Sequence, residues 1–131
     1  MPNREDFIRS CEQVCEDEEW TLEPGRIEID FESGRHQSVS FEFFEFEGQA
    51  LVRLHSRIGS TKHIDPVRLT SALSLNFRLP HGALAVHKDE LVIVDTMMVS
   101  EADPAEIAAA FGYLAETADH YERTMFGPDI H

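Results

Sequence analysis

The chain has 131 residues, the size of one domain, and 42% of them are hydrophobic, which is typical of a globular protein. A formal net charge of −14 disfavours nucleic acids and anionic membranes as partners, because both repel a polyanion. Two cysteines do not make a disulfide framework, and the sequence shows neither an apolar leader nor a membrane-spanning apolar stretch. We therefore expect a single cytoplasmic domain over residues 1–131.

The charge is unevenly spread along the chain. Residues 51–88 contain one acid, Asp65, against six bases, a net charge of +5, whereas both flanking segments are strongly acidic. Two explanations stay open: the basic segment faces an acidic one, within the fold or across a dimer, or surface charge is simply unequal along the chain.

A first helix is predicted after Asn3, a residue type that caps helices well. Its apolar positions recur at helical spacing: Phe7, Ile8, Cys11, Val14 and Cys15. Cys11 and Cys15 share one face of this helix, where consecutive turns are a poor fit for a disulfide. We expect buried thiols, with half of a metal site as the alternative.

Three strands are predicted next. Residues 27–32 alternate strictly between apolar and acidic side chains, which indicates a half-buried strand. Residues 39–46 and 52–58 follow as the second and third strands, separated by turns at 33–36 and 47–49. Short turns between consecutive strands predict an antiparallel meander.

The apolar phase of the second strand changes part-way along. Val39, Phe41 and Phe43 share one face, but Phe44 and Phe46 fall on the other. Either a bulge resets the register and turns these phenylalanines inward, or the second face of the sheet becomes apolar here.

A second helix begins at Asp65-Pro66, a carboxylate cap followed by proline at the first helical position, and stops near Asn76. Residues 82–87 and 90–99, joined by Lys88-Asp89, then predict a β-hairpin. The second strand of this hairpin is apolar on both faces, which indicates that both faces are covered. Its two sets of apolar residues are Leu91, Ile93 and Met97 on one face and Val92, Val94 and Met98 on the other.

A last amphipathic helix begins at Asp103-Pro104, which repeats the cap-and-proline pair, and continues to Gly127-Pro128. The predicted order is α-β-β-β-α-β-β-α. We therefore expect an α+β fold in which helices cover a twisted antiparallel sheet.

This order, at this size and acidity, resembles the small dimeric chaperones of type III secretion, in which a Leu-rich second helix ends in an Asn and a hairpin and a long closing helix follow. Shorter stretches are similar to the related YbjN-type proteins, which share that fold and are described as sensory-transduction regulators. The stretches that carry the two resemblances are LTSALSLNF (69–77) for the chaperones, and VRLHSRIG (52–59), LPHGALAV (79–86), ELVIVDTM (90–97) and ADHYERTMFGPD (118–129) for the YbjN-type proteins. The resemblance implies a type III secretion chaperone-like fold, a homodimer and a protein partner.

The histidines and cysteines give the alternative hypothesis, a metal- or small-ligand-responsive regulator that uses His81, His87, Cys11 and Cys15. His81 and His87 are six residues apart, which on one straight strand separates them by about 20 Å, too far for one ion. A bend at Gly82 would shorten that distance. The sequence contains no metal-ligand motif, and His131 is the last residue.

Catalytic groups are not recognisable in the sequence, so we expect no enzyme and no cofactor. Asp95 lies in the apolar run VIVDTMM, on the side of Leu91 and Ile93. A buried acid needs a partner. It is therefore expected either to pair with a base or to lie in water near the end of the strand, and the bases open to it are Arg53, Arg57 and Arg78.

Some apolar side chains are left without an obvious cover. They are Phe44, Phe46, Val92, Val94 and Met98. An exposed apolar patch of this kind is typical of an interface; the alternatives are helices on both sheet faces, or the inward bulge. The preferred hypothesis is a homodimeric, non-catalytic module that holds a segment of another protein on this surface, by strand addition or groove binding.

Overall fold

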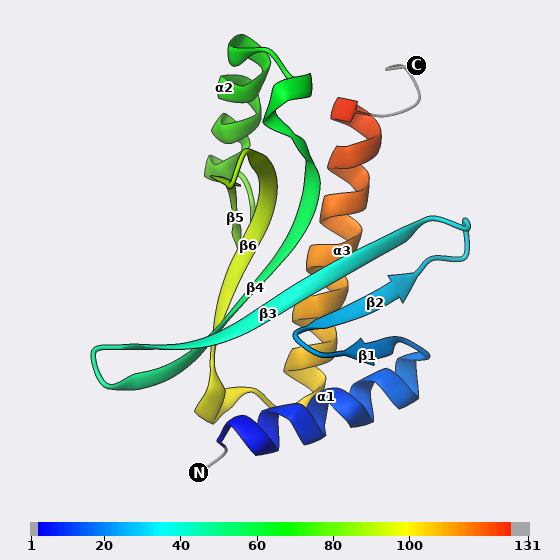
Figure 1. The fold of residues 1–131 in the computed structure, drawn as a ribbon, viewed down its shortest axis with the longest axis vertical. Helices are drawn as coiled ribbons and strands as arrows, with labels where there is room; N and C mark the ends of the chain where they lie inside the picture. Colours follow the sequence, from blue (N-terminus) through cyan, green and yellow to red (C-terminus); the bar gives the residue numbers. More distant parts are fainter. Residues whose placement is uncertain (1–2, 127–131) are drawn as a thin grey trace.

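Six strands and three α-helices make up the computed structural model, which describes residues 3–126 (Figure 1). In chain order they are α1 (Arg4–Glu18), β1 (Thr21–Glu23), β2 (Arg26–Asp30), β3 (His36–Phe46), β4 (Gln49–Ser60), α2 (Pro66–Ser74), β5 (Ala83–His87), β6 (Glu90–Met98) and α3 (Pro104–Phe126). Short 3-10 turns lie at Thr61–His63 (η1), Leu75–Phe77 (η2) and Val99–Glu101 (η3).

The predicted α+β order is confirmed, with one strand added. β1 is only three residues long and pairs with β2 through Leu22 and Ile27. A turn at Glu23-Pro24-Gly25-Arg26 closes this small hairpin, and Gly25 takes the positive φ of 77° that the turn needs. Gly127-Pro128, the predicted end of the last helix, and His131 lie outside the described residues.

The helix starts follow the caps that the sequence predicts. Asn3 and Asp6 form a capping box at α1, with both hydrogen bonds at 2.9 Å. The Asp65 carboxylate accepts a hydrogen bond from the Arg68 amide at α2, at 2.8 Å. Asp103 does the same for Glu106 at α3, also at 2.8 Å. Each carboxylate or amide oxygen satisfies an N–H that the first helical turn leaves free.

All strand pairs are antiparallel, in the order β1-β2-β3-β4-β6-β5. One cross-strand row, read from β2 to β5, consists of Ile27, Val39, Ser56, Ile93 and Leu84. Every residue of this row is buried, in a core that also contains residues of all three helices. Residues in one row point to the same side of a sheet. The three helices therefore cover one face of the sheet.

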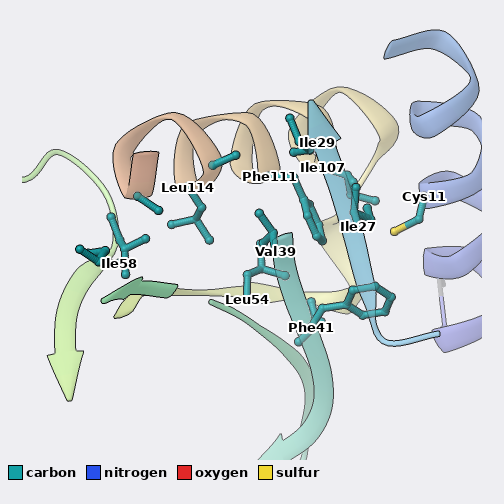
Figure 2. Packing of buried hydrophobic residues seen from close by; sticks show 14 of the residues in the cluster. Cys11, Ile27, Ile29, Val39, Phe41, Leu54, Ile58, Ile107, Phe111 and Leu114 are labelled. Atoms are coloured by element: carbon teal, nitrogen blue, oxygen red, sulfur yellow. The ribbon is translucent and has the colours of Figure 1, made fainter. Parts of the chain in front are cut away.

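The core lies between that face and α3, with α1 closing one end (Figure 2). Phe111 of α3 lies against Phe41 of β3 at a ring-centroid distance of 6.0 Å in an edge-on arrangement. Cys11 enters the same core from α1 and is fully buried. None of the helices described between residues 3 and 126 combines the length and apolarity that crossing a bilayer requires.

The phase change in β3 reflects a second apolar face. β3 and β4 pair without interruption from Val39–Ser56 to Phe46–Gln49, so the alternative of a bulge after Phe43 is wrong. The irregularity lies instead in β4, between Arg57 and Gly59, where the register against β6 shifts. Phe44 and Phe46 therefore point away from the helices.

Candidate protein-binding surface

The sheet face that the helices leave uncovered is called the open face here. Its side chains follow from the register of the strands: Glu28 and Asp30 of β2; His36, Ser38, Ser40, Glu42, Phe44 and Phe46 of β3; Leu51, Arg53, His55 and Arg57 of β4; Val92, Val94, Thr96 and Met98 of β6; and Ala83, Ala85 and His87 of β5. All five residues of the predicted binding surface belong to it. The alternative that helices cover both faces of the sheet is excluded for residues 3–126.

An apolar row crosses the open face near the β3–β4 turn. Phe44, Leu51 and Met98 are cross-strand neighbours, and each is half-buried. The Arg53 guanidinium lies over the Phe44 ring, 4.0 Å from its centroid, a cation–π contact that holds the ring in place. Phe46, beside the turn, is 61% exposed. Figure 1 shows this hairpin reaching well beyond the helices.

A shallow hollow of about 280 Å³ lies further along the open face, between β4, β6 and β5. Val92 and Val94 form its floor, and the rings of His55 and His87 stand 5.9 Å apart at its side. Val92 is only 4% exposed, because its cross-strand neighbour Arg57 and these rings flank it. Val94 stays partly open to solvent.

The bases of the open face meet acids on neighbouring strands. Arg53 pairs with Glu42 of β3 at 3.6 Å, and Arg57 pairs with Glu90 of β6. Two of the six bases of the segment 51–88 thus pair with acids from outside it, within a single chain.

Two histidines of the open face have pKa values shifted in opposite directions. Burial lowers the pKa of His55, and the nearby His87 lowers it further, so the neutral imidazole is favoured. His36 lies between two carboxylates, with Nδ1 2.7 Å from Asp30 and Nε2 2.5 Å from Glu28. The hydrogen bond with Asp30 is the main reason that the pKa of His36 is raised. The alternation of residues 27–32 predicted a half-buried strand but gave no sign of this cluster.

The four residues of the metal-site hypothesis are not brought together. Cys11 and Cys15 are buried in the core under α1, and burial raises the pKa of Cys11 to about 12. His81 lies against Tyr113 of α3, with ring centroids 5.6 Å apart, whereas His87 lies beside His55 on the open face. Within residues 3–126, no three histidines, cysteines or acids are placed to hold a metal ion.

Asp95 is half-buried and lies three residues before the end of β6. Its carboxylate accepts a hydrogen bond from the Thr96 amide at 2.8 Å. Arg53 and Arg57 lie on the opposite sheet face and pair with other acids. Arg78 forms no ion pair with Asp95 either. Of the two predicted surroundings, the structure therefore matches the second, an acid in contact with water near the end of a strand.

No family model matches this sequence, and no curated protein matches it significantly. Solved structures, however, are similar over nearly its whole length. The crystal structure of the ExsC–ExsE complex has a TM-score of 0.70 at 9% identity and covers 95% of this chain and 97% of that chain. The HopA1–SchA chaperone–effector complex has a TM-score of 0.60 at 8% identity, covering 89% and 93%.

A third similar structure is the Yersinia pestis type III secretion chaperone SycH in complex with a stable fragment of YscM2, with a TM-score of 0.52 at 14% identity, covering 86% and 97%. The fold is that of a type III secretion chaperone. This confirms the chaperone-like fold that the sequence order predicts. Identities this low show the fold alone. The YbjN-type resemblance stays a prediction.

Proposed function

We propose that this chain is a non-catalytic, homodimeric chaperone of the cytoplasm that holds a segment of a partner protein against its open face. The observation that supports this most is the open face itself, where apolar side chains lie on the side of the sheet that none of the three helices covers. The three similar chaperone-fold proteins were each solved with a second protein, ExsE, HopA1 or a YscM2 fragment. The homodimer is proposed from that fold, and the partner site from the open face.

The chemistry of the open face suits a peptide more than a small molecule. Phe44, Val94 and Met98 are already half-buried, so covering the rest of each contributes roughly 1 kcal/mol, about half of the value for full burial. Around them, the ion pairs Glu42–Arg53 and Glu90–Arg57 give the polar rim that protein interfaces have around an apolar centre. The apolar area spans three strands and has the breadth for an extended or amphipathic segment.

Site-specific crosslinking tests the proposed surface. The photoreactive p-benzoylphenylalanine replaces Phe44 in one variant and Phe77, which is 96% exposed on η2 away from the open face, in the matched control. Irradiation in the source cell is expected to give a crosslinked partner from position 44 and none from position 77. Equal crosslinking from both positions, or from 77 alone, overturns the proposed surface.

The variant Val94→Asp tests whether the open face binds the partner protein or a second copy of this chain. The control is Val67→Asp on α2, where the valine is 76% exposed. Sedimentation equilibrium of the wild type is expected to give twice the chain mass of 14.9 kDa, and both variants should keep that mass. A monomeric wild type removes the homodimer, and a monomer seen for Val94→Asp alone would assign the open face to the second copy instead.

A further inference from the structure

A second hollow, of about 420 Å³, lies between the end of β6 and α3, past the part of β6 that pairs with β5. One wall is the end of β6, residues 95–98, and the other is α3, through Ala109, Ala110 and Tyr113. His81 also lines this hollow, which is called the β6–α3 groove below. Its apolar lining comes from Met97, Met98 and the α3 side chains.

The β6–α3 groove runs along an unpaired strand edge. β5 begins at Ala83, opposite Val94, so residues 95–98 of β6 pair with β4 alone. Before β5, the chain turns away at Gly82, whose φ is 70°. The Tyr113 hydroxyl donates to the His81 carbonyl at 3.1 Å and holds the departing chain against α3. The edge of β6 after Val94 is thereby left without a neighbouring strand from residues 3–126 on this side.

Backbone groups of β6 point to this free edge. The Leu84 backbone bonds outward to Asn76, so its partner Ile93 directs its own backbone groups toward β4. By alternation Thr96 then presents its backbone to the outer edge, where its carbonyl is free in the part of the chain that the structure describes and its amide is held by the Asp95 side chain. Because outward- and inward-facing residues alternate in an antiparallel strand, Met98 presents its backbone to the same edge. An unpaired edge of this kind is a template for another extended chain.

The outer edge of β5 is occupied at Leu84. The Asn76 side-chain amide donates to the Leu84 carbonyl at 3.0 Å, and its oxygen accepts from the Leu84 amide at 2.5 Å. On this side of the sheet, the residues after Val94 in β6 therefore offer the edge to a further strand.

The charges of the groove define the chemistry of its occupant. Asp95, Glu101 and Glu106 line it, and none of the three forms an ion pair with another residue of the described part of the chain. Carboxylates at the rim of an apolar groove attract a cationic side chain. A second copy of this chain, with a net charge of −14, is the less suitable occupant.

We infer that the β6–α3 groove binds an extended segment of the partner protein by strand addition to residues 95–98. The segment carries a lysine or arginine beside apolar side chains: the base meets the three carboxylates, and the apolar residues contact Met97, Ala110 and Tyr113. This inference rests on the proposed function, because it names a second contact that the partner makes outside the open face.

A fluorescent peptide of alternating valine and arginine is the probe, with the full chain titrated in and fluorescence anisotropy measured. Matched peptides carry glutamine or glutamate in place of arginine. We expect saturable binding of the arginine peptide, about fivefold or more weaker binding of the glutamine peptide, and none of the glutamate peptide. Glu106→Gln is expected to weaken the binding of the arginine peptide about fivefold and to reduce the salt dependence of that binding.

Ala109→Arg fills the groove and places a positive charge in it. It should therefore weaken the binding of the arginine peptide about tenfold or more. The matched control is Ala105→Arg, which makes the same charge change at an exposed position one helical turn earlier, outside the groove lining. Equal effects of the two variants, equal binding of all three peptides, or no saturable binding would each overturn the inference. If Val94→Asp abolishes peptide binding and Ala109→Arg leaves it intact, the peptide binds the open face. The inference about the groove is then wrong, and the proposed function stands.

Discussion

Neighbouring residues of each strand point to opposite faces of the sheet, and these two faces have different surroundings. In β6, Ile93 faces the helices and is fully buried, whereas Val94 faces away from them and stays partly open. Both are β-branched and fit a strand equally well. The apolar alternation of the sequence thus defines two surfaces, and the helices cover only one of them. An apolar strand face is committed to the core only when another element of the same chain covers it.

Removing a phenylalanine from each face should give the largest difference. Phe111→Ala leaves a cavity between α3 and Phe41 and is expected to lower the free energy of unfolding by about 3–5 kcal/mol. Phe44→Ala removes a half-buried ring whose main contact is Arg53, and should lower it by about 1 kcal/mol or less. Urea unfolding of the two variants measures both values, and similar losses would show that the open face is as closely packed as the core face.

Replacing a serine on each face should give an intermediate difference. The Ser56 hydroxyl is buried, 2.9 Å from the Gln37 side-chain oxygen and 2.7 Å from the Ser38 carbonyl oxygen, and donates its one hydrogen to one of these two acceptors. Ser56→Ala leaves buried acceptors without that donor, so we expect a loss of about 1–3 kcal/mol in unfolding free energy. Ser40→Ala, on the open face, should change it by about 0.5 kcal/mol or less. Chemical denaturation at one pH compares them, and a Ser40 effect as large as that of Ser56 contradicts the comparison.

The smallest effects concern the two histidines of the open face. Because the folded state raises the pKa of His36 above 6.5, its contribution to stability is complete below pH 6.5 and is lost as the pH rises through the raised value. The folded state lowers the pKa of His55, so the contribution of His55 is complete above pH 6.5 and is lost as the pH falls. NMR titration of the ring protons should therefore place His36 above 6.5 and His55 below it.

His87→Gln refines this comparison. The change removes the nearby imidazole and should raise the pKa of His55 part of the way toward its ordinary value, since burial is the larger cause of the shift. His36, held by Asp30 and Glu28, should titrate unchanged in this variant. A moved His36 pKa would mean that the variant disturbs the whole face.

Local signals predicted most of the fold. Asp65-Pro66 and Asp103-Pro104 mark the two later helices, because a cap and a proline act within one turn and need no tertiary contact. The strand β1 was missed, since three residues carry no readable period and form a strand only by pairing with β2. The phase change at Phe44 was visible in the sequence, but the choice between its two explanations depended on the register with β4.

The candidate site was predictable only in its apolar part. Strand alternation grouped Val92 with Val94, because both lie on one strand. The ring pair His55–His87 joins β4 to β5, which lie on either side of β6, and the β6–α3 groove joins residues of β6 to residues of α3 that follow much later. Such neighbours are set by strand order and helix position, which single-strand periodicity does not encode.

Asn76 on η2 gives Leu84 the same two hydrogen bonds that an adjacent strand would give. A single amide side chain therefore occupies the backbone groups that a further strand would need at Leu84. A strand from another copy would have to displace Asn76 before it could pair along β5, which disfavours growth of the sheet from chain to chain.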